Sequence, residues 1–214
     1  MAYIVSDLQT KLKTQIGDPN LDSTVMLDAL NYTQQAIFGT FDTTLNSAQQ
    51  TNAVATGANI LTSALPTDLQ RISSLYISSP TAYAKNLTSY FVPIKDFREL
   101  YPNAGTDSGS LQEWSFWTSV EFAVDSVVDV VIKIDYVKYV PILSASTDIP
   151  TIPQPYEELL LLGSKMRIYE QKEDFDYAGQ FNSRYADLVE AFIRRYSTRQ
   201  VDVQMVVPGA RNRV

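Results

Sequence analysis

The sequence predicts an α+β fold in which N- and C-terminal α-helical hairpins form a helical bundle that a β-rich antiparallel insertion splits. At both ends of the 214-residue chain, apolar residues recur at spacings of three and four, the period of one helix face. In the middle they recur at every second position, as on a half-buried strand. We therefore place the bundle at 1–42 and 151–199, the insertion at 43–150 and an extended C-terminal arm at 200–214.

Two apolar stripes predict the N-terminal hairpin. They consist of Leu8, Leu12 and Ile16, and then of Leu27, Leu30, Gln34, Ile37 and Phe41. Gly and Pro within Gly17–Asn20 favour a turn between them. Asp22, Ser23 and Thr24 then offer a carboxylate or hydroxyl groups that can cap the free N–H groups of the second helix. The segment therefore reads as two helices joined by a tight turn.

The C-terminal hairpin is expected within Ile152–Arg199. Pro153 and Pro155 suit the start of its first helix, where an N–H group has no partner to lose. The polar segment Gln171–Asp174 allows the chain to fold back. The apolar stripe from Phe175 to Tyr196 then predicts one continuous helix of about six turns. A pair of helical hairpins with apolar faces can pack together as a bundle.

The insertion shows the two-residue period of antiparallel strands at Trp114–Val124 and again at Val128–Tyr136. The polar stretch Thr43–Ala58 is expected to be a loop that leads into a strand near its end. Trp114 and Trp117 would lie on opposite faces of a single strand, because three positions separate them. One ring would then be buried and the other exposed, so both tryptophans are candidates for contact with a neighbouring subunit.

Catalytic chemistry has little support in the sequence. The chain contains no histidine and no cysteine, which excludes His-based catalysis and thiolate metal sites. Glu173, Asp174 and Asp176 lie at a helix junction, where helix capping explains them better than a divalent cation does. No enzyme activity, catalytic residue, metal site or cofactor is expected. No apolar run approaches the roughly 18 residues of a membrane span, and no signal peptide is recognisable.

The charge of the chain is uneven. A net charge of −7 argues against a general nucleic-acid-binding surface. The C-terminal region is basic instead, with Arg194, Arg195, Arg199, Arg211 and Arg213 against Asp202 alone. Apolar residues alternate in the arm, at Val201, Val203, Met205 and Val207. Such a segment can add to the edge of a sheet in a partner. The alternatives are a solvated end and a strand within the chain's own insertion sheet.

Three segments carry a family resemblance: Leu65–Ile77, Val92–Pro102 and Ile132–Ser144, the last of which leads into the C-terminal hairpin. Together they resemble the head-to-tail adaptor proteins of tailed bacteriophages, also called head completion or connector proteins. Members of that family place terminal helices around a β-rich insertion. They assemble into a ring below the portal, usually as twelve copies, and grip the portal with a C-terminal arm.

The resemblance implies a structural protein of the virion neck that is made in the host cytoplasm and takes part in genome ejection. Its partners would be further copies of itself, the portal protein, and tail tube, nozzle or tail fibre proteins, with no membrane. DNA would pass through the ring without sequence-specific binding, and an acidic lumen would repel its phosphates.

The resemblance also assigns roles to residues. The portal-docking arm would use Val201, Val203, Met205, Val207, Arg211 and Arg213. Subunit contacts would involve Trp114, Trp117, Arg194 and Arg195. The alternatives are a tail terminator or other neck ring protein, and a carbohydrate- or host-protein-binding module carried by the insertion. A hydrolase built on paired carboxylates comes last, because nothing in the sequence brings such carboxylates together.

Overall fold

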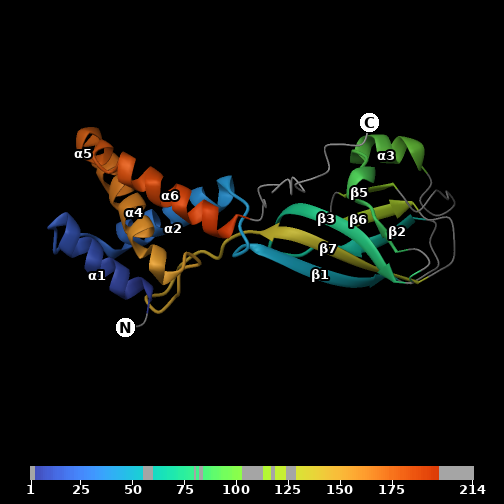
Figure 1. The fold of residues 1–214 in the computed structure, drawn as a ribbon, viewed down its shortest axis with the longest axis horizontal. Coiled ribbons are helices and arrows are strands. Elements are labelled where there is room, and N and C mark those ends of the chain that lie inside the picture. The colour runs from blue at the N-terminus through green and yellow to red at the C-terminus, as the bar shows by residue number, and fades with distance from the viewer. Residues whose placement is uncertain are drawn as a thin grey trace, which may run out of the picture. The chain divides into compact units, whose positions relative to one another are not determined.

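The computed structural model describes residues 3–54, 60–79, 81, 84–102, 113–116, 119–123 and 129–197. The chain divides into two compact units (Figure 1). The helical unit combines Met1–Asn46 with Val140–Val214, and the sheet unit is Ser47–Tyr139. The predicted class is confirmed, because helices and an antiparallel four-stranded sheet are both present. The predicted C-terminal arm lies outside the described residues.

The N-terminal helices are α1 (Val5–Ile16) and α2 (Ser23–Thr40). Gly17 ends α1 in the left-handed conformation at φ 75°, which glycine adopts without steric cost. The Asp22 carboxylate accepts a hydrogen bond from the Thr24 N–H at 2.7 Å. This bond is the main cause that lowers the pKa of Asp22. The predicted turn and the predicted cap are both confirmed.

Helix α4 (Glu157–Gln171) lies at the centre of the helical unit. A single 3-10 turn (Gln154–Tyr156) with Pro155 leads into it. It packs against α1, α2 and the helices that follow it in the chain. At Gly163 the neighbours come so close that a Cβ atom there would lie 2.4 Å from a Thr33 methyl carbon and 2.8 Å from a Tyr185 ring carbon. The missing side chain therefore sets how closely these helices approach.

The predicted continuous helix from Phe175 to Tyr196 is wrong. Two helices occupy this stretch, α5 (Phe175–Gly179) and α6 (Asn182–Tyr196). Between them, the N–H groups of Gln180 and Phe181 bond to carbonyl groups three residues back, so the helical register is interrupted. The break allows α5 to pack against α4, with the Tyr177 and Tyr169 ring centroids 4.7 Å apart.

The sheet unit contains two antiparallel sheets. The four-stranded sheet has the order β1 (Ser47–Val54), β7 (Val130–Lys138), β3 (Leu69–Ser79) and β4 (Lys85–Asn86). The three-stranded sheet has the order β2 (Ile60–Ala64), β6 (Ser119–Ala123) and β5 (Trp114–Phe116). A 3-10 turn (Thr88–Tyr90) and helix α3 (Ile94–Leu100) complete the unit. Its core includes Leu75, Ile77, Val130, Ile132 and Ile134.

Two expectations for the insertion are also wrong. Strand β1 forms where a loop was expected, in unbroken register with β7. Its partly buried positions include Gln50 and Asn52, so its sequence lacks the apolar alternation that predicts a strand. The expected single strand Trp114–Val124 is instead the antiparallel pair β5–β6, in which Trp114 faces Phe122.

Substitution of Gly163 tests the close packing of α4. We expect Gly163→Ala to lower the free energy of unfolding by about 1–3 kcal/mol, the usual cost of overpacking a core. Urea denaturation followed by circular dichroism measures the change.

Gly39→Ala is the matched control, because Gly39 also lies within a helix and has nothing within 4 Å of its Cβ position. We expect this variant to be neutral, or more stable by up to about 1 kcal/mol from helix propensity alone. Equal effects of the two substitutions would contradict the packing role of Gly163.

Candidate docking surfaces

Two amide side chains of α2 hold the segment through which the chain returns from the sheet unit to the helices. We call Val140–Thr151 the return segment. The Asn31 side chain donates to the Leu143 carbonyl at 2.9 Å and accepts from the Leu143 N–H at 2.8 Å. The fully buried Gln34 donates to the Pro141 carbonyl at 3.3 Å and accepts from the Thr151 N–H at 2.7 Å. Both ends of the segment are thereby tied to one helix.

The middle of the return segment is tied to itself and to α1. The Asp148 carboxylate accepts from the N–H groups of Ala145 and Ser144 at 2.8 and 2.7 Å, and these bonds lower its pKa. The Val5 N–H donates to the Asp148 carbonyl at 3.0 Å, and the Ser6 N–H donates to a return-segment carbonyl at 2.9 Å. The return segment belongs to the helical unit. From the sequence, residues 43–150 were all expected to belong to the insertion.

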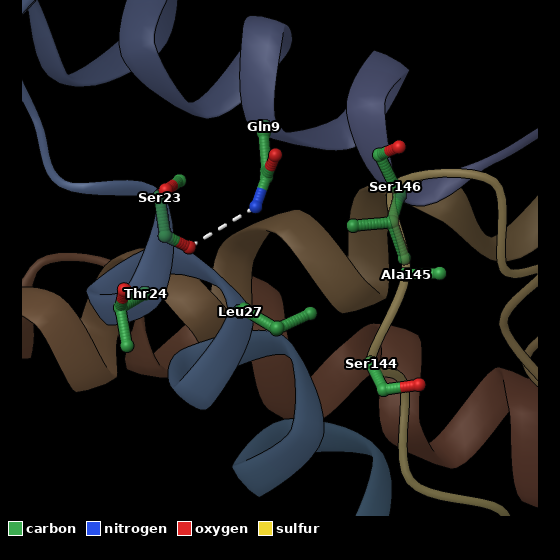
Figure 2. A pocket seen from close by; sticks show the side chains of 8 residues that line it. Gln9, Ser23, Thr24, Leu27, Ser144, Ala145 and Ser146 are labelled. Carbon is green, nitrogen blue, oxygen red and sulfur yellow. Dashed lines mark hydrogen bonds between the residues drawn. The ribbon is translucent and has the colours of Figure 1, made fainter.

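A groove of about 200 Å³ opens between α1, α2 and the return segment (Figure 2). The Gln9 side chain crosses one side of it and donates to the Ser23 carbonyl at 3.0 Å. Its lining is Val5, Gln9, Ser23, Thr24, Leu27, Ser144, Ala145 and Ser146, which includes hydroxyl groups but no ionisable side chain. Ile142 and Ile149 of the same segment are 67% and 71% exposed. The groove and the exposed apolar side chains of the return segment are candidates for docking.

A second candidate surface lies where α4 meets α5. We call Glu170, Glu173, Asp174, Phe175, Asp176 and Tyr177 the acidic tip. Phe175 is 67% exposed and Tyr177 is 45% exposed, although the Tyr177 ring contacts the Tyr169 ring in a tilted geometry and the Phe181 ring edge to face. Lys165 lies 4.3 Å above the Phe181 ring, and burial lowers the pKa of this lysine. The acidic tip thus combines exposed aromatic rings with carboxylates, next to the packed rings of Tyr169 and Phe181.

The backbone of the acidic tip is fixed by local hydrogen bonds. Glu173 has a φ of 59°, in the left-handed region where glycine is usual. This conformation lets the Asp174 N–H donate to the Tyr169 carbonyl at 2.9 Å, which closes the end of α4. The Asp174 carboxylate then caps α5 by accepting from the Tyr177 N–H at 3.2 Å. The predicted capping role is confirmed for Asp174.

The residues predicted for subunit contacts have different environments. Trp114 is only 3% exposed, and its indole N–H donates to the Leu87 carbonyl at 2.6 Å, which leaves little of its surface for a neighbouring copy. Trp117 lies outside the described residues. Arg194 and Arg195 are exposed on the last turn of α6, where Arg194 pairs with Glu190.

All residues predicted for portal docking lie outside the described part of the chain. Sequence reasoning missed the Asn31 amide and counted Gln34 as part of an apolar stripe. The position of Gln34 on an otherwise apolar helix face was a signal that could have revealed its role. A buried amide needs hydrogen-bond partners.

The described residues contain neither a metal-binding cluster nor a membrane-spanning helix. Within them, no three acidic side chains come together in a group that could hold a metal ion. Across the same residues, no helix is both long and apolar enough to cross a membrane. The features that remain are exposed apolar groups on firmly held segments. Exposed apolar groups of this kind are typical of surfaces that bind other proteins.

The chain belongs to the SU10 adaptor protein family, whose sequence profile it matches over residues 3–211. The match confirms the resemblance to phage head-to-tail adaptors, because it spans both units and nearly the whole chain. A comparison with curated proteins found no match.

Substitution of Asn31 tests the hold of α2 on the return segment. Asn31→Ala removes two hydrogen bonds and leaves the Leu143 N–H and C=O groups without partners, so we expect a loss of about 1–3 kcal/mol in unfolding free energy. Hydrogen exchange at the Leu143 amide should accelerate. Gln35→Ala, at an exposed position of the same helix, is the control and should change neither quantity. An unchanged exchange rate in Asn31→Ala would contradict the proposed hold.

Substitution of Glu173 tests the strain at the acidic tip. We expect Glu173→Gly to raise the unfolding free energy by about 1 kcal/mol, because glycine adopts a positive φ without steric cost. Lys172→Gly is the neighbouring control, with a native φ of −86°, and should not stabilise the protein. Thermal and urea denaturation of both variants provide the comparison.

Proposed function

We propose that this protein is a structural head-to-tail adaptor of a bacteriophage virion. Copies of the chain form a homododecameric ring that joins the portal to the tail and leaves a channel for DNA. The observation that carries this proposal is the family match over residues 3–211. Membership implies association with portal and tail proteins, oligomerisation and a place in the virion neck.

The helical unit supplies a rigid body for such a ring. Its buried core joins residues from both ends of the chain, including Leu8, Leu30, Leu160 and Phe192. We propose that the two helical hairpins form a bundle, and that this bundle is the body of each subunit. The groove beside the return segment and the acidic tip are then available on its surface for partners.

The arm at 200–214 is proposed to dock on the portal protein. Support comes from the point where the arm begins: the Thr44 N–H donates to the Tyr196 carbonyl at 2.7 Å, and Thr43 and Ser197 form an antiparallel bridge. Ser197, the last described residue before the arm, is therefore held at the end of α6 by the segment that follows α2. In the sequence, the alternating valines and the two last arginines then follow.

The lumen of the ring is proposed to be acidic. The chain has a net charge of −7, and the segment from Arg194 to the C-terminus has five arginines against one acid, so the rest of the chain is more acidic than the whole. A negative wall repels phosphates and lets DNA slide without sequence-specific binding. A tail tube, nozzle or tail fibre protein would occupy the opposite side of the ring from the portal.

Removal of the arm tests the portal assignment. We expect deletion of Gln200–Val214 to abolish binding to the purified cognate portal, while the circular dichroism spectrum and unfolding transition stay close to those of the full chain. Binding is measured by co-sedimentation of the protein with portal rings.

A finer comparison uses the two faces of the predicted strand. Changing Val201, Val203, Met205 and Val207 to serine should abolish binding. Asp202 and Gln204 belong to the other face of this predicted strand. Changing both of them to serine should preserve portal binding. Retained portal binding by the deletion variant would contradict the role of the arm. Binding to tail tubes in place of portals would favour the tail terminator alternative.

A further inference from the structure

We propose that the acidic tip of one copy docks against the C-terminal end of α6 in the next copy, so that the subunits join head to tail. The inference rests on the proposed ring, and it assigns the surfaces through which neighbouring copies meet. The two surfaces are the acidic tip and the exposed pair Arg194 and Arg195 with the apolar residues beside it.

Apolar surface is available at both sites. Phe175 and Tyr177 are exposed at the tip. Helix α6 is strongly amphipathic, yet Phe192 is its only fully buried residue among the 15 that compose it. The rest of its apolar stripe is partly buried and consists of Tyr185, Leu188, Val189, Ile193 and Tyr196. An incompletely covered apolar face is typical of an interface between subunits.

The charges at the two sites are complementary, and some of them are unpaired within one copy, although Glu170 pairs with Arg167 and Asp174 caps α5. In the described part of the chain, Glu173 and Asp176 form no ion pair, and neither does Arg195. Arg194 pairs only with Glu190 one turn away, an exposed contact that contributes little to stability. These groups can therefore pair with charges on another molecule.

The two sites cannot satisfy each other within one copy. The tip precedes the first turn of α6, and the arginines occupy its last turn. A helix of 15 residues with a rise of 1.5 Å per residue separates its ends by about 22 Å. That separation far exceeds ion-pair distance and the Debye length of about 8–10 Å. The two sites can therefore pair with each other only between different copies.

Such an arrangement generates a ring. Two different surfaces that bind each other form a heterologous contact, which repeats from copy to copy and closes when the rotation permits. Acidic residues before a helix and basic residues at its end also suit the helix dipole. The dipole accounts for the signs of these charges, but it does not account for the exposed Phe175 and Tyr177 rings.

Disulfide trapping between two variants tests the contact directly, because the natural chain contains no cysteine. Full-length Asp176→Cys and Arg195→Cys proteins, distinguished by a mass tag on one of them, are mixed under mild oxidation with and without cognate portal rings. We expect the mixed disulfide dimer to exceed either homodimer several-fold. The control replaces Arg195→Cys with Glu99→Cys, an exposed position of α3 in the sheet unit, and should not enrich the mixed dimer.

A charge exchange provides a second readout. Asp176→Arg and Arg195→Glu should each reduce assembly in native mass spectrometry, and the double variant should recover it. A mixed dimer no more frequent than the control, in a protein that still joins the portal in a fixed ratio, would overturn this contact and leave the adaptor function intact. A dominant disulfide homodimer of the Asp176→Cys protein would overturn the head-to-tail orientation. A protein that neither self-associates nor binds the portal would overturn both proposals.

Discussion

The helical unit depends on the hydrogen bonds between two amides of α2 and the backbone of the return segment. Asn31 and Gln34 each donate one bond and accept another. Because Gln34 is fully buried, water could not replace its partners without a large cost. The return segment in turn binds the first residues of α1 through its own carbonyl groups. One set of polar contacts therefore joins α1, α2 and the segment that leads to α4.

This arrangement holds surface segments of the helical unit in place. Segments that are firmly held can present apolar side chains to solvent at fixed positions, as the return segment does with Ile142 and Ile149. Docking surfaces that are already ordered lose less conformational entropy when a partner binds. The adaptor family to which the chain belongs is consistent with this use of the fold.

The sequence predicted those helices and strands in which apolar residues recur with the period of the element. Helices α1, α2 and α4 bury one face, so their period is visible, and Asp22 and Asp174 are caps of an expected kind. Strand β1 was missed because its pairing with β7 defines it, while its own residues are mostly polar. The break between α5 and α6 was missed because Ala178 and Phe181 fit the helical stripe, although Phe181 packs against Tyr169. The charges of the acidic tip were visible, but the exposure of Phe175 needed the structure.

Native mass spectrometry of the full-length protein, alone and mixed with the cognate portal, tests the adaptor assignment most directly. An adaptor is expected to give either a discrete ring of the protein alone or a monomer that adds to the portal ring in one fixed ratio. A protein that stays monomeric and does not associate with the portal at any concentration would contradict it.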